Sequence, residues 1–196
     1  KWLKDSKDAN IGSLRGLKVD ESDNTYLCGS VNSVARGSRY LTAKFNDKGN
    51  YEWSRYYDGQ PFATNDVANA LVIDHNQNVI VTGESFKNIT NIDVATIKYN
   101  SNGVLQWTKR SDNDSINNGG YIVKVDVNDN LYVAGYVGND WYSPKSFLLK
   151  YNSNGNQIKK RNFLQTAVIS IAVNSQGICY VGGYKHCDFI TCPNNP

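Results

Sequence analysis

The chain has 196 residues, and its 21 Lys and Arg against 18 Asp and Glu give a net charge of +3 at pH 7. This balance lacks the basic excess of a nucleic-acid binder, and no apolar run reaches the roughly 18 residues of a membrane-spanning helix. We therefore expect no nucleic-acid partner and no transmembrane segment. With 16 Gly, 13 Tyr and 20% charged residues, the composition favours many short strands joined by turns.

A ten-residue segment recurs four times along the chain. Its copies begin with Asp or Asn, end with Gly, and occupy residues 20–29, 74–83, 126–135 and 174–183. A second block, Lys-aromatic-Asn-x-x-Gly, recurs at residues 44–49, 98–103 and 150–155. Trp53 and Trp107 each follow the closing Gly of that block by four residues. A repeat of about 50 residues built from short strands is typical of a β-propeller blade.

Each repeat predicts four strands in succession. The first strands are the apolar runs at 17–19, 71–73, 123–125 and 171–173, each followed by a turn rich in Asp, Asn, Ser and Gly. The second strands carry two adjacent apolar columns, Tyr26-Leu27, Ile80-Val81, Tyr132-Val133 and Tyr180-Val181. Adjacent columns predict strands covered on both faces by neighbouring blades. The third strands fall at 41–45, 94–99 and 147–151, the fourth lie around each Trp, and no segment predicts a helix.

These strands predict an all-β fold, a β-propeller of four-stranded antiparallel blades forming one domain over residues 1–196. The repeats are residues 17–57, 71–110, 123–162, and 171–196 completed by 1–4. The opening Lys-Trp-Leu-Lys aligns with a fourth strand, and residues 188–192 resemble a third strand. We expect four blades, with the N-terminal strand closing the last blade and removing an exposed sheet edge. The alternative is a fragment of a larger propeller.

The repeat resembles the SBBP β-propeller repeat. The resemblance is clearest over residues 71–107, which contain an apolar strand, Asp-x-x-x-Asn, and Ala-Thr-Ile-Lys-Tyr-Asn-Ser-Asn-Gly-x-x-x-Trp. Lys159 replaces the Trp in the third repeat, and Asn174 replaces the Asp in the fourth. The resemblance implies a propeller within a secreted or cell-surface bacterial or archaeal protein, outside the cytoplasm. It implies no catalytic residue.

A candidate binding surface lies where the first strands begin. The loops predicted at this face vary most between repeats, and loops on a rigid scaffold commonly carry binding residues. Trp141 and Tyr142 lie in a polar loop, where exposed aromatic rings stack on sugars or anchor protein partners. The alternative is that this loop folds its own aromatic side chains onto the blade edge. The candidate ligand-binding residues are Arg36, Arg39, Tyr136, Asn139, Trp141, Tyr142, Tyr184 and His186.

Neither a metal nor another cofactor is expected. The Asp-x-Asn-x-Asn turns beginning at Asp74 and Asp126 resemble the start of a calcium loop. They lack the Gly and distal Glu of an EF-hand, so hairpin turns held by Asx hydrogen bonds are the favoured interpretation. These turns are the one place where calcium remains an alternative.

The four cysteines allow one disulfide to be proposed. Cys187 and Cys192 are close enough in sequence to form it, with a metal site that includes His186 as the less favoured alternative. Cys28 and Cys179 fall at opposite parity on equivalent strands, which predicts that they face opposite sides of their sheets and do not pair.

The sequence favours a non-catalytic extracellular binding or scaffold module that recognises glycan or protein at a cell surface through the loop-bearing face. One alternative is a self-assembling structural unit of a surface layer, filament or adhesin. A further alternative is a hydrolase or lyase centred on the propeller channel, because a propeller can build a site from one residue per blade. The chain contains no nucleophile elbow, P-loop or dinucleotide fingerprint.

Overall fold

A computed structural model describes residues 13–33, 37–59, 64–88, 90–111, 117–138 and 144–185. Within these ranges the chain forms fifteen strands in four sheets and no helix. The all-β expectation is confirmed. No helix in this part of the chain is long and apolar enough to cross a membrane.

Each sheet is a meander whose strands pair antiparallel in chain order. The first contains β1 (Ser13–Val19), β2 (Thr25–Ser33), β3 (Gly37–Phe45) and β4 (Tyr51–Tyr57), with the short β5 (Thr64–Asn65) parallel to β3. The second contains β6 (Val67–Ile73), β7 (Val79–Phe86), β8 (Ile92–Tyr99) and β9 (Leu105–Ser111). The third contains β10 (Asn118–Val125), β11 (Leu131–Val137), β12 (Lys145–Tyr151) and β13 (Gln157–Phe163). The fourth contains β14 (Thr166–Val173) and β15 (Cys179–Lys185).

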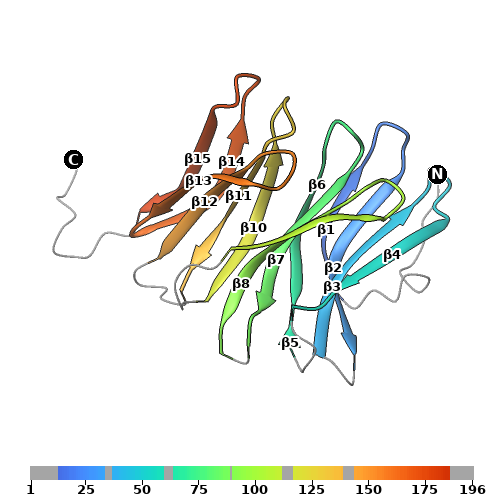
Figure 1. The fold of residues 1–196 in the computed structure, drawn as a ribbon, viewed down its shortest axis with the longest axis horizontal. Helices are drawn as coiled ribbons and strands as arrows, with labels where there is room; N and C mark the ends of the chain where they lie inside the picture. The colour runs from blue at the N-terminus through green and yellow to red at the C-terminus, as the bar shows by residue number, and fades with distance from the viewer. Residues whose placement is uncertain are drawn as a thin grey trace.

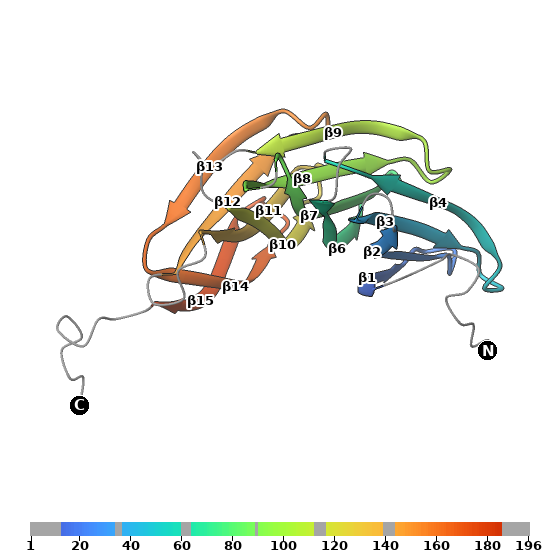
Figure 2. The same cartoon turned by 90° about the horizontal axis from the view of Figure 1, so that it is seen from below.

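The four sheets lie side by side in chain order and form an open arc (Figures 1 and 2). Figure 2 shows the first strand of each sheet (β1, β6, β10 and β14) toward the concave side and β4, β9 and β13 on the convex side. The first and fourth sheets occupy opposite ends of the arc. Residues 1–4 and 188–192, which were expected to complete the fourth repeat, lie outside the described residues.

The turn between the first two strands of each sheet is held by side-chain oxygens, as the Asx interpretation predicted. Asp74 Oδ1 accepts the backbone N–H groups of Asn76 at 3.0 Å and Asn78 at 2.9 Å. Asp20, Asp126 and Asn174 accept the equivalent pairs. Because these oxygens satisfy turn amides that have no ladder partner, each short turn is fixed locally.

Apolar side chains fill the spaces between consecutive sheets. Tyr26 and Leu71 belong to the cluster between the first two sheets, Ile80 and Val123 to the next, and Tyr132 and Ile171 to the last, and these clusters define the core. The repeated Trp adds a polar link at the convex side. Trp53 Nε1 donates to the carbonyl oxygen of Ser101 at 3.0 Å, and Trp107 Nε1 donates to that of Ser153 at 3.4 Å.

The second strand of every repeat was predicted to be covered on both faces by neighbouring sheets. This prediction is wrong for the fourth repeat. Tyr26, Ile80 and Tyr132 are at most 3% exposed because the following sheet packs on them. Tyr180, at the same repeat position, is 58% exposed, because the described chain places no further sheet against the fourth.

Candidate functional site: a tyrosine-lined pocket

The first strand of every sheet carries a β-bulge at the same repeat position. Pairing with the second strand skips one residue, and the skipped residues are Arg15, Asn69, Tyr121 and Ile169. A bulge redirects the side chain of the extra residue and commonly lies beside functional sites. The first strands lie along the concave side (Figure 2), so the four bulged residues, which differ in chemistry, all belong to strands of that side.

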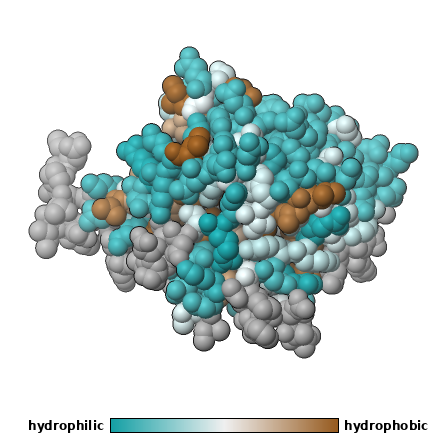
Figure 3. Space-filling model, in the orientation of Figure 1, coloured by the Kyte–Doolittle hydropathy of each residue, from teal (hydrophilic) through white to brown (hydrophobic). Residues whose placement is uncertain are grey.

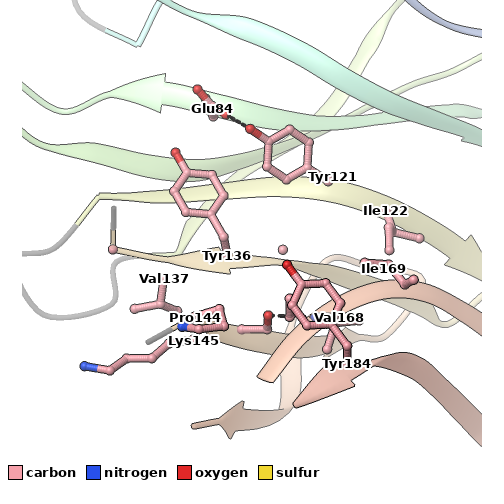
Figure 4. A pocket seen from close by; sticks show the side chains of 14 residues that line it. Glu84, Tyr121, Ile122, Tyr136, Val137, Pro144, Lys145, Val168, Ile169 and Tyr184 are labelled. Carbon is pink, nitrogen blue, oxygen red and sulfur yellow. Dashed lines mark hydrogen bonds between the residues drawn. The ribbon is translucent and has the colours of Figure 1, made fainter. Parts of the chain in front are cut away.

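Two of the bulged residues, Tyr121 and Ile169, line a pocket of about 860 Å³. The pocket is formed mainly by the third and fourth sheets, with β7 of the second sheet at one end (Figure 4). The residues that give it chemical character are Glu84, Tyr121, Tyr136, Lys145, Ile169 and Tyr184. Three phenols, one carboxylate and one ammonium group thus surround a partly apolar space.

A hydrogen bond across two sheets fixes one wall of the pocket. The Tyr121 hydroxyl donates to Glu84 Oε1 at 2.5 Å, and the Tyr121 and Tyr136 ring centroids lie 5.4 Å apart with the planes tilted by 33° (Figure 4). Burial, followed by the hydrogen bond to Glu84, raises the pKa of Tyr121 well above its usual value. Burial and the nearby Glu84 charge likewise raise the pKa of Tyr136. Both phenols therefore stay neutral near pH 7 and can donate hydrogen bonds.

The opposite wall presents side chains that solvent can reach. The Tyr184 side chain is 55% exposed and lies close to Val168 and Ile169 (Figure 4). Ser146 serves a structural purpose here, because its Oγ donates to the Thr166 carbonyl oxygen at 2.8 Å and accepts the Val168 N–H at 2.9 Å. This pair of bonds ties β12 to β14. The aromatic ring of Tyr184 therefore stands on a firmly linked pair of sheets.

The structure brings together two of the sequence-predicted binding residues and separates a third. Tyr136 and Tyr184 both line the pocket. Arg39 lies on β3 in the first sheet, where its guanidinium carbon stands 4.4 Å from the centroid of the Tyr56 ring, and it does not line the pocket. The remaining predicted residues, Arg36, Asn139, Trp141, Tyr142 and His186, lie outside the described residues.

Glu84, Tyr121 and Ile169 were missed by sequence reasoning. A signal for Glu84 was present, because Glu84, Tyr136 and Tyr184 occupy the same repeat position at the end of the second strand. The bulges left no equivalent signal, because the bulged residues precede the apolar runs from which the first strands were predicted.

The described cysteines are free and lie on opposite sheet faces, as predicted. Cys28 is buried against the second sheet, whereas Cys179 packs toward the third sheet. Burial raises the pKa of Cys28 to about 12. The proposed Cys187–Cys192 disulfide lies outside the described residues.

The carboxylates of the candidate calcium turns already have protein partners. Asp74 Oδ2 lies 2.7 Å from Lys98 Nζ, and Asp126 Oδ2 lies 3.8 Å from Lys150 Nζ. Among the described residues, no group of three or more His, Cys, Asp or Glu side chains is placed to hold a metal ion.

No family model and no curated protein matches the chain. A solved structure of a protein of unknown function from Bacteroides caccae is similar, with a TM-score of 0.53 and 12% identity over 90% of this chain and 58% of that one. A second, described as the crystal structure of the eukaryotic initiation factor, has a TM-score of 0.49 and 13% identity over 84% of this chain and 35% of that one. The chain thus spans less than two thirds of either structure. The first likeness shows a shared fold and carries no information about ligands.

Proposed function

We propose that the chain is a propeller-type, non-catalytic binding module that takes a glycan into the pocket between the third and fourth sheets. Each sheet would be one blade, with its first strand nearest the propeller axis, as in the repeat that the sequence resembles. The arc of meanders supports this reading, because each sheet packs on the next in the same way. Because the repeat resembles one found in secreted and surface-exposed proteins, the proposed binding would take place outside the cytoplasm.

The observation that carries the proposal is the set of Tyr121, Tyr136 and Tyr184 around one pocket. Sugar rings offer apolar C–H faces that stack on aromatic rings and hydroxyl groups that exchange hydrogen bonds with phenols and carboxylates. The volume of about 860 Å³ lies in the range of about 300–1,000 Å³ typical of small-molecule sites. A short oligosaccharide therefore suits this pocket better than a protein surface does.

The same geometry favours binding over hydrolysis. Glycoside hydrolysis ordinarily uses two carboxyl groups on either side of the scissile bond. Glu84 is the one carboxylate among the described residues that line the pocket, and its Oε1 accepts the Tyr121 hydrogen bond.

A glycan array probed with the labelled full chain, followed by calorimetry with the strongest-binding oligosaccharide, tests the proposal. Tyr184→Ala should weaken that binding about two- to tenfold, because the contact with one aromatic ring contributes about 0.5–1.5 kcal/mol. Tyr51→Ala is the matched control, since Tyr51 is also an exposed tyrosine but lies on β4 of the first sheet. Absence of binding across the array, or equal affinity for wild type and Tyr184→Ala, would refute the glycan site.

A further inference from the structure

The two charged side chains that line the pocket stand at opposite ends of it. Among the described residues these are Glu84 and Lys145. Figure 4 shows Glu84 on one side of the Tyr136 ring and Lys145 on the other side, beside Val137 and Pro144. Lys145 is exposed, and it forms no ion pair with Glu84. The pocket therefore has a negative end and a positive end.

Lys145 occupies a repeat position that holds a charged residue in each of the first three sheets. Its counterparts are Arg39 and Asp93, which pair with the same position of their own second strands. The guanidinium carbon of Arg39 stands 4.4 Å from the centroid of the Tyr56 ring, and Asp93 Oδ2 lies 3.0 Å from an Arg110 nitrogen. Among the described residues, no carboxylate lies at ion-pair distance from Lys145. Its positive charge is therefore available to a ligand.

The first strands of the sheets add positive charge and no negative charge. Their charged residues are Arg15, Lys18 and Lys124, which are all exposed, and none of the four strands contains Asp or Glu. Burial raises the pKa of Tyr121, and the positive charge of Arg15 acts against that rise, so Arg15 lies within electrostatic reach of the pocket wall. Cations on strands of one side attract anions over distances of about 10 Å at 0.1 M salt.

We propose that the oligosaccharide taken into this pocket is acidic, and that Lys145 binds its carboxylate or sulfate group while neighbouring sugar rings contact the tyrosines. This inference rests on the proposed glycan site and adds the charge and the direction of the ligand. The acidic group lies at the Lys145 end, because Glu84 would repel it at the other end. At that other end, sugar hydroxyl groups donate hydrogen bonds to the Glu84 carboxylate.

The surface shown in Figure 3 suits a polar ligand better than a protein partner. This side of the molecule is largely hydrophilic, and its apolar patches are small and separate. A protein partner commonly covers one contiguous apolar patch instead. An exposed contact between an ammonium group and an acidic group strengthens binding about two- to fivefold. Such a gain is enough to select the acidic form of a sugar over its neutral form, while the tyrosines supply the contact that both forms share.

Calorimetry of the full chain with matched pairs of sugars tests the inference. Trigalacturonate is compared with its methyl ester, which keeps the sugar rings and loses the negative charge. A chondroitin sulfate tetrasaccharide is compared with its unsulfated form, so the two pairs distinguish a carboxylate from a sulfate. In at least one pair, the more acidic form should bind about three- to tenfold tighter at about 20 mM salt, and this difference should shrink at about 500 mM salt because salt screens the attraction.

Substitution of Lys145 shows whether this side chain carries the preference. Lys145→Gln should weaken binding of the preferred acidic sugar about two- to fivefold, because it removes the positive charge and keeps a polar side chain. Lys159→Gln is the matched control and should leave the affinity unchanged, since Lys159 is also exposed but lies on β13 at the convex side. Because both lysines are exposed, both variants should melt at the wild-type temperature.

The outcomes separate this inference from the glycan site on which it rests. Equal affinity within both sugar pairs, while Tyr184→Ala still weakens binding, would overturn the inference and leave the glycan site standing. Equal effects of Lys145→Gln and Lys159→Gln would also overturn it. Polyphosphate that binds as tightly as the acidic sugar would overturn it too, because charge alone would then explain the binding. Absence of binding by every sugar would refute the glycan site itself and the inference with it.

Discussion

Replacing Gly83 by Ala should destabilise the fold more than its small size suggests. Gly83 closes the ten-residue repeat, and a Cβ built there would lie 1.9 Å from the Val67 carbonyl oxygen and 2.9 Å from the Ala68 Cα. These atoms belong to β6 beside its bulge, so backbone rather than a flexible side chain would have to move. The equivalent glycines have the same close approach to the facing strand, at 1.8 Å for Gly29, 1.8 Å for Gly135 and 2.1 Å for Gly183.

The magnitude follows from the displacement required. Separating the new Cβ from the carbonyl oxygen to ordinary contact needs a shift of more than about 1 Å, and overpacking a rigid interior costs about 1–3 kcal/mol and occasionally more. We predict about 3 kcal/mol for Gly83→Ala, which corresponds to a fall in Tm of about 6–12 °C for a chain of this size.

Scanning calorimetry and urea unfolding would measure this effect. Gly182→Ala is the control, because a Cβ there meets only Ser170 atoms at 3.9 Å, although the residue lies in the same kind of strand. The control should leave Tm unchanged or raise it slightly, since Ala restricts the unfolded chain more than Gly does. Equal Tm values for Gly83→Ala and Gly182→Ala would refute the close-approach reasoning.

Two further predictions concern titratable groups. The hydrogen bond between His75 Nδ1 and Asp129 Oδ1, at 2.7 Å, raises the pKa of His75 above its usual 6.5. An NMR titration of His75 should therefore have a midpoint above pH 6.5, and Asp129→Asn should lower that midpoint. Because the pKa of His75 is raised in the folded state, the His75–Asp129 pair stabilises the fold below about pH 6.5, and this contribution is lost as the pH rises through the raised pKa. His75→Ala should therefore lower Tm more at about pH 5.5 than at about pH 8.5. A Tm difference that does not change with pH would contradict this. Burial raises the pKa of Cys28 to about 12, so at about pH 8 iodoacetamide should label Cys28 only on unfolding, while the half-buried Cys179 reacts earlier. Peptide mass spectrometry would decide this, and equal labelling rates in the native protein would contradict it.

The repeats made most of the fold predictable. Their spacing, the Asp and Asn turns and the apolar columns gave the strand order, because hairpins depend on local turn chemistry and alternation. Coverage of Tyr180 was predicted wrongly because a repeat pattern cannot show what lies beyond the last sheet.

The candidate site was only partly predictable. Tyr136 and Tyr184 were selected as residues of predicted variable loops; the structure places them on β11 and β15, where both line the pocket. Tyr121 was missed because its side chain is redirected by a bulge, and pairing register cannot be read from one strand alone. Arg39 does not line this pocket, because it lies on β3 with its guanidinium over the Tyr56 ring, a contact that the repeat position does not reveal.

An NMR titration of the isotope-labelled full chain with the strongest-binding oligosaccharide from the array tests the proposed pocket most directly. The account predicts shift changes concentrated at Glu84, Tyr121, Tyr136 and Tyr184, with little change in the convex strands β4 and β9. Changes confined to the convex strands, or no change at saturating sugar, would contradict it.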